Sequence, residues 1–233
     1  LILGVLTIYC NGQQIVIGIG INLFGPGFAY MLMRALWDTT GISPWVEGFQ
    51  IVNIPLLSDI PVVGTMLSGY PACVYLGLLA VVVMQYLLRR TAWGLRIRAV
   101  GENPAAVATL GINVLGVKYM GCVICGFLSG LGGAYLTTCY SSTYTDGIVA
   151  GRGFIALAAV IFGRWNAGGI LLACLFFGLC DALQIKLQVA GIDIPYQFFQ
   201  MIPYVATVVV LSIIGTKQAA PKANGQPYRK EQR

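Results

Sequence analysis

Apolar runs separated by short polar segments occupy most of the 233-residue chain. Several of these runs come close to the roughly 20 apolar residues that a helix needs to span a membrane. The longest runs lie at residues 15–36, 71–88, 118–140, 168–187 and 198–215. The pattern therefore predicts an all-α fold, a polytopic bundle of transmembrane helices.

Two shorter apolar runs, at residues 1–9 and 153–163, call for separate interpretations. The first has the character of the end of a span, so we expect an N-terminally truncated transmembrane domain over residues 1–215. The second could make a short crossing if it extends over residues 150–165, about 24 Å at roughly 1.5 Å per residue. Between residues 37 and 70 the sequence is mixed and contains prolines, which predicts an irregular segment.

Charged residues are few and unevenly placed. They make up 9% of the chain and hydrophobic residues 58%. A soluble domain carries roughly 25% charged residues, so this composition argues against a soluble fold, and its apolar excess argues against disorder. Ten of the 14 Lys and Arg residues fall in the inner loop (residues 89–118) or the tail (residues 216–233). Because cations beside apolar runs favour the cytoplasm, we place both segments there, expect a disordered tail, and expect no nucleic-acid binding.

The number of crossings must agree with this placement. Two segments on the same side of a membrane are joined by an even number of crossings. The candidates between the inner loop and the tail are residues 118–140, 153–163, 168–187 and 198–215. Parity therefore requires the short run to cross, and it predicts six full crossings with residues 37–70 on the outer side.

Some residues within the spans are unusual for a helix in lipid. A Gly-Pro-Gly at residues 25–27 predicts that the helix over residues 15–36 is broken or kinked. Asn22 is polar, and Asp181 and Gln184 share one helix face at i and i+3. Polar side chains in a span normally face a bundle interior or water. A substrate pathway and an interhelical hydrogen-bond cluster both satisfy this requirement.

Combinations of residues that perform chemistry are missing from the sequence. The chain has no histidine, which excludes Ser-His-Asp and Cys-His catalysis and His-ligated zinc. Cys122 and Cys125 form a C-x-x-C with no second pair, so we interpret the seven cysteines as packing residues. No P-loop or G-x-G-x-x-G is present. We expect no catalytic residue, no metal and no cofactor bound by this chain.

The inner loop carries the most informative pattern. Asn103 can cap a helix that has Pro104 at its first position, the following AAVATL favours helix, and Gly111 can end it. The pattern predicts a short cytoplasmic helix flanked by cations. A coupling helix of this kind docks into the ATPase of an ABC transporter.

Motifs along the whole chain occur in a fixed order, beginning with GLRIRAVGENPAAVATLGINV and GFLSGLGGAYL. These two resemble the permease subunits of ABC importers of the ribose and branched-chain amino acid class. The later motifs are GRGFIALAAVIFGRWNAGG, FFGLCDALQ, IPYQFFQMIPYVATVVVL and the terminal PYRKE. They are more similar to the nucleoside-importer branch of that class.

The resemblance implies partners that composition cannot show. The chain would pair with a second permease subunit in the bacterial plasma (inner) membrane. A separate cytoplasmic ABC ATPase would hold the ATP and magnesium, and an extracytoplasmic substrate-binding lipoprotein would deliver the substrate. The residues that dock the ATPase would be those of the GENPAA motif: Gly101, Glu102, Asn103, Pro104, Ala105 and Ala106. Asn22 and Asp181 match polar positions within spans and, with Gln184, are our candidates for the substrate pathway.

We therefore expect a permease subunit of an ATP-driven nucleoside importer, and not an enzyme. One alternative is an ion-coupled secondary transporter, which would need an intramembrane acid such as Asp181. Another alternative is an ABC permease for a sugar or a branched-chain amino acid. A membrane enzyme or a structural subunit is a further class, for which the sequence offers few reactive residues.

Overall fold

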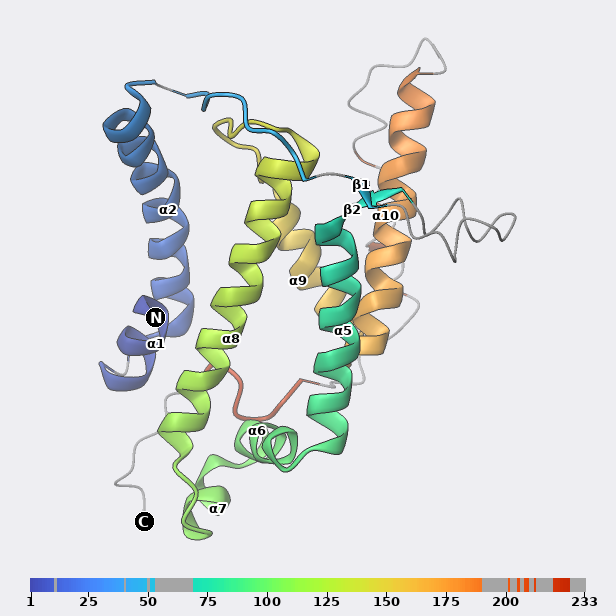
Figure 1. Cartoon of the computed structure of the whole chain (residues 1–233). Coiled ribbons are helices and arrows are strands. Elements are labelled where there is room, and N and C mark those ends of the chain that lie inside the picture. The colour runs from blue at the N-terminus through green and yellow to red at the C-terminus, as the bar shows by residue number, and fades with distance from the viewer. Residues whose placement is uncertain are drawn as a thin grey trace. The chain divides into compact units, whose positions relative to one another are not determined.

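The computed structural model describes residues 1–10, 12–39, 41–49, 51–52, 69–189, 201, 205, 208–209, 212 and 220–226. Helices make up most of this part of the chain (Figure 1). The chain divides into two compact units. The first unit comprises residues 1–80, 86–150 and 221–233, and the second comprises residues 81–85 and 151–220.

The first unit holds the helices that precede residue 141. They are α1 (Ile2–Gly4), the π-helix η1 (Val5–Tyr9), α2 (Gln14–Trp37), most of α5 (Ala72–Arg90), α6 (Ala92–Glu102), α7 (Pro104–Thr109), α8 (Val114–Tyr135) and the π-helix η2 (Leu136–Tyr140). Two short strands, β1 (Ile51–Val52) and β2 (Tyr70–Pro71), pair antiparallel, with Ile51 opposite Pro71.

Four helical segments are long and apolar enough to cross a membrane. They are Gln14–Trp37, Ala72–Arg90, Val114–Tyr140 and Ala167–Val189. They confirm the predicted spans at residues 15–36, 71–88, 118–140 and 168–187, and with them the all-α polytopic fold. The predicted span at residues 198–215 lies outside the described residues apart from isolated positions.

Helix α2 is continuous, which corrects the prediction of a broken helix, while the kink stays a prediction. The helix runs from Gln14 to Trp37 and continues through Pro26. A proline removes one backbone donor from a helix, but neighbouring groups in a transmembrane segment can satisfy the carbonyl that it frees. The helix ends where Asp38 adopts a left-handed conformation and donates its N–H to the Arg34 carbonyl at 3.2 Å.

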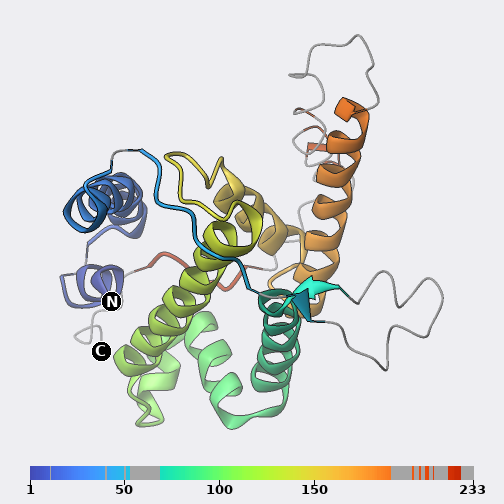
Figure 2. The same cartoon turned by 45° about the horizontal axis from the view of Figure 1, so that its top comes forward.

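The second unit contains a tight helical hairpin of α9 (Arg152–Phe162) and α10 (Ala167–Val189) (Figure 2). Ala159, Ala173 and Phe177 are buried between the two helices. At the turn a Cβ on Gly169 would lie 2.9 Å from the Gly163 Cα, so only glycine permits this approach. The hairpin is therefore packed by its own small and aromatic residues.

The length of α9 corrects the prediction of a helix over residues 150–165. Gly151 is left-handed with φ of 75°, and the helix ends at Phe162 after 11 residues. Such a helix is about 16 Å long, shorter than a hydrocarbon core of about 30 Å. The parity argument required a crossing here, but α9 is too short to span the membrane.

The irregular segment before β1 is held by the chain beyond η2, within the first unit. The Ser43 N–H donates to the Tyr144 carbonyl at 2.9 Å, and the Tyr144 N–H donates to the Ser43 hydroxyl at 2.8 Å. The Val46 N–H donates to the Ser142 carbonyl at 2.9 Å. Residues 43–49 are irregular, as predicted, whereas β1 and the start of β2 add a short strand pair to the 37–70 interval.

Candidate functional site

The inner loop begins with a sharp turn between α5 and α6. Thr91 is extended, and its hydroxyl donates to the Leu87 carbonyl at 2.6 Å and accepts the Gly94 N–H at 3.2 Å. A Cβ on Gly94 would lie 2.6 Å from the Cα and the oxygen of Leu88. Thr91 thus caps α6, and Gly94 lets α6 turn directly against the end of α5.

Helix α7 has the boundaries that the sequence predicts. The Asn103 side chain accepts the Ala106 N–H at 3.1 Å, and Pro104 occupies the first helical position. Gly111, two residues past the last helical residue, is left-handed with φ of 76°. A side-chain cap at one end and glycine beyond the other satisfy groups that a short helix would otherwise leave without partners.

A small apolar core supports this loop from within. Its buried members are Val100, Val107, Val114 and Val117. Each comes from a different part of the loop or from the first turn of α8, so that α6, α7 and α8 pack around the same point. Full burial of a valine contributes about 1.5–3 kcal/mol relative to exposure. This core gives the inner loop a defined structure outside the spans.

The GENPAA residues lie on the surface of that structure. Glu102, Asn103, Ala105 and Ala106 are exposed, and Gly101 and Pro104 are half-buried. Leu110, which ends α7, is 77% exposed. We call Ala105, Ala106, Thr109 and Leu110 the α7 face, because all four are exposed on this one short helix and its cap. An exposed face on a supported helix is suited to contact with a protein partner.

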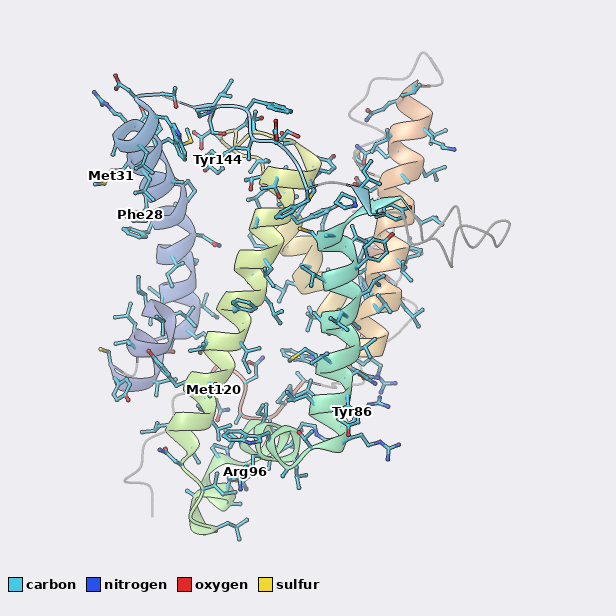
Figure 3. The ribbon with its side chains drawn as sticks, viewed as in Figure 1. Phe28, Met31, Tyr86, Arg96, Met120 and Tyr144 are labelled. Atoms are coloured by element: carbon cyan, nitrogen blue, oxygen red, sulfur yellow. The ribbon has the colours of Figure 1, made fainter. Side chains whose placement is uncertain are left out.

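Cations lie close to the α7 face in the sequence. Arg96 and Arg98 are exposed on α6, and the Arg96 guanidinium lies 5.6 Å from the ring centroid of Trp93. Figure 3 shows Arg96 on α6, at the same end of the first unit as Tyr86 on α5 and Met120 on α8. Exposed arginines at this place agree with the expected cytoplasmic side.

The candidate pathway residues are placed on two different helices. Asn22 is exposed on α2, in the first unit. Asp181 and Gln184 lie on α10, in the second unit. Asp181 is exposed and Gln184 is half-buried. Asp181 and Gln184 share a face of α10, as their spacing predicts.

Two features of the inner loop were missed from the sequence. One is α6, because Gly94 and the alternation of Arg with apolar residues do not follow the spacing of an amphipathic helix. The other is the cap of α8, where the Asn113 side chain accepts the Gly116 N–H at 3.1 Å. Asparagine directly before an apolar run was an available signal for that cap.

Comparisons with known proteins agree with this architecture. A family model described as branched-chain amino acid transport system, permease component, matches residues 1–211. A nucleoside ABC transporter permease protein of Lactococcus lactis subsp. cremoris is 40% identical over 97% of this chain and 72% of the relative. A guanosine ABC transporter permease protein of Bacillus subtilis is 36% identical, over 96% of this chain and 71% of the relative.

A more distant relative has a different printed substrate. It is a putative glucose ABC transporter permease protein of Haloferax volcanii, 32% identical over 97% of this chain and 75% of the relative. No solved structure matches the chain. The family model, the high coverage of these relatives and the four long apolar helices lead to one conclusion. The chain belongs to the family of the branched-chain amino acid transport system permease component, and it is a multi-pass membrane permease of the ABC transporter class.

Proposed function

We propose that this permease forms the membrane pathway of an ATP-driven importer of nucleosides and docks a separate ATPase through the α7 face. The observation that carries the docking proposal is a capped helix, α7, supported by its own valine core and exposed on its outer side. A movement of the ATPase can reach the permease only through a contact segment that keeps its own structure. The buried core of the inner loop holds that structure in place.

The proposed partners follow from this role. A second permease subunit completes the pathway in the bacterial plasma membrane, and an extracytoplasmic lipoprotein delivers the substrate. ATP and magnesium bind to the ATPase. The inner loop and the tail lie in the cytoplasm, in agreement with their cations.

Nucleosides are the substrate class that the relatives support best. The relatives at 40% and 36% identity are permeases for nucleosides and for guanosine. The glucose permease at 32% identity makes a sugar the second candidate. Because a nucleoside contains a sugar, a pathway for either substrate would need side chains that donate and accept hydrogen bonds, as Asn22 and Gln184 can.

The substrate test uses the complete transporter in liposomes. The permease, its second permease subunit and the ATPase are reconstituted, and the binding lipoprotein is added with a nucleoside, glucose, ribose or leucine. We expect nucleosides to stimulate ATP hydrolysis and the other three compounds to have no effect. Stimulation by glucose or ribose alone would replace the nucleoside proposal with a sugar.

The docking test places a bulky side chain on the α7 face. Ala105→Trp adds an indole to an exposed position of α7, and Ala92→Trp makes the same change at an exposed position of α6. We expect Ala105→Trp to reduce ATPase binding and uptake at least tenfold and the matched control to retain both. Equal behaviour of the two variants would contradict docking through the α7 face.

An ion-coupled transporter remains distinguishable from this proposal. Uptake would then depend on the acid Asp181 and on an ion gradient. We expect uptake to continue when an uncoupler collapses the gradient and ATP is maintained. Loss of uptake under those conditions, and its loss in Asp181→Asn, would favour ion coupling.

A further inference from the structure

Residues 220–226 of the tail form an ordered turn, which corrects the prediction of a disordered tail for these residues. The Asn224 N–H donates to the Pro221 carbonyl at 3.1 Å, and the Gln226 N–H donates to the Ala223 carbonyl at 3.3 Å. Gly225 is left-handed with φ of 73°. In both hydrogen bonds the N–H donates to the carbonyl three residues earlier, and the two together fold the segment into a compact turn.

This turn contacts the inner loop at two places. The Ala223 N–H donates to the Gly101 carbonyl at 3.0 Å, and a Cβ on Gly101 would lie 3.2 Å from the Pro221 Cβ. The Lys118 ammonium donates to the Gln226 carbonyl at 3.2 Å. Pro221 and Ala223 are half-buried, whereas their neighbours in the turn are exposed.

The two contact points lie on either side of α7. Gly101 is in the last turn of α6, where a carbonyl has no partner within its own helix, and Ala223 supplies the missing donor. Lys118 lies near the beginning of α8. The tail turn therefore connects the end of α6 to the beginning of α8, and α7 is the segment between them.

The contact leaves the outer side of α7 open. Ala105, Ala106 and Thr109 are exposed, and Leu110 is 77% exposed, with the tail turn present. A segment that blocked a partner would cover these residues. The tail turn instead holds the base of the loop and leaves its contact surface accessible.

We propose that residues 221–226 are a brace that holds α7 in the position that the ATPase recognises, so that the end of the chain strengthens ATPase docking. The inference rests on the proposed role of the α7 face. Its physical basis is preorganisation: a loop already fixed in its bound position loses less conformational freedom when the partner binds.

The test removes the donor in the brace. Ala223→Pro eliminates the N–H that donates to Gly101 and disfavours the turn at the preceding residue. The matched control is Lys222→Pro, which places proline at the second position of the Pro221–Asn224 turn, where proline is favoured. Lys118→Met removes the second contact independently.

The first measurement is amide hydrogen exchange of the complete permease pair without the ATPase. We expect exchange in residues 104–110 to be roughly 2–10-fold faster in Ala223→Pro, the range for one lost hydrogen bond, and unchanged in Lys222→Pro. Unchanged exchange in both Ala223→Pro and Lys118→Met would overturn the brace. Because the ATPase is absent, this result does not depend on the docking proposal.

The second measurement is the ATPase concentration that gives half-maximal complex formation. We expect this concentration to rise roughly 2–10-fold in Ala223→Pro and Lys118→Met and to stay unchanged in Lys222→Pro. A fall would show that the tail competes with the ATPase, and no change would show that it does not assist docking; either outcome overturns the inference. If Ala105→Trp abolishes binding while the tail variants do not alter it, the proposed function stands and the brace is wrong.

Discussion

The inner loop and helix α2 contain apolar residues in similar abundance but place them differently. In the inner loop, Val100, Val107, Val114 and Val117 are buried against one another. Over the 24 residues of α2 only Met33 is buried, and Leu23 is 77% exposed. A Cβ added at Gly18, Gly20, Gly25 or Gly27 would meet no described atom within 4 Å.

The difference reflects the surroundings that each segment is built for. The inner loop mixes its apolar residues with charged and polar ones, and in water it must bury its valines to have a fixed structure. A helix in lipid satisfies its backbone internally, and lipid is as apolar as its side chains. Of these two segments, the inner loop is therefore stabilised by its own packing, while α2 depends on what surrounds it.

The largest expected effect comes from the turn at the start of α6. Gly94→Val would place a branched side chain against the Leu87 and Leu88 backbone, which cannot move without disturbing α5. We expect the free energy of unfolding to fall by more than about 3 kcal/mol, measured by denaturant titration and by yield in the membrane. Gly77→Val, in α5 but with nothing within 4 Å, is the control. Equal losses in both variants would mean that the close contact of Gly94 with the α5 backbone does not cause the loss of stability.

A pair of truncations tests the comparison directly. Val107→Ala removes two buried methyl groups from the inner loop, and we expect a loss of about 2 kcal/mol from lost burial and the cavity left behind. Leu23→Ala removes a larger group from α2 but should change the free energy of unfolding by less than about 0.5 kcal/mol. Both are measured on the purified permease. A greater loss at Leu23 would reverse the comparison.

A smaller effect is expected from the cap of α7. Asn103→Ala removes the acceptor for the Ala106 N–H and should cost about 1 kcal/mol. The loss is read from faster amide exchange in α7. Asn103→Ser retains a capping oxygen and should restore most of the protection. If serine behaves like alanine, the side chain serves some purpose other than capping.

The sequence predicted those parts of the fold that depend on neighbouring residues. The four long spans follow from continuous apolar runs, and α7 follows from Asn103, Pro104 and Gly111 within eight positions of one another. The end of α9 at Phe162 was missed because the parity argument extended the short apolar run to residue 165, whereas the turn is set by the close approach of Gly163 and Gly169.

The candidate site was also only partly predictable: its helix could be read from the sequence, and its contact with the tail could not. Helix α7 was predicted from a local motif, whereas the GENPAA residues were chosen as the docking site through the family resemblance, and that role stays a prediction. The contact between Ala223 and Gly101 joins residues far apart in the sequence through a backbone hydrogen bond, and a backbone donor leaves no mark on residue identity. The tail therefore looked like a solvated basic segment.

The smallest expected effect is at the glycines of α2. Gly20→Ala adds a methyl group where no described atom lies within 4 Å, and alanine restricts the unfolded chain more than glycine does. We expect the purified permease to gain about 0.5 kcal/mol in its free energy of unfolding. The same denaturant titration measures it, with Gly121→Ala in α8, which also has open space, as the control. A loss of more than about 1 kcal/mol at Gly20 alone would mean that another part of the chain packs on α2, because overpacking is destabilising only where atoms are already in contact.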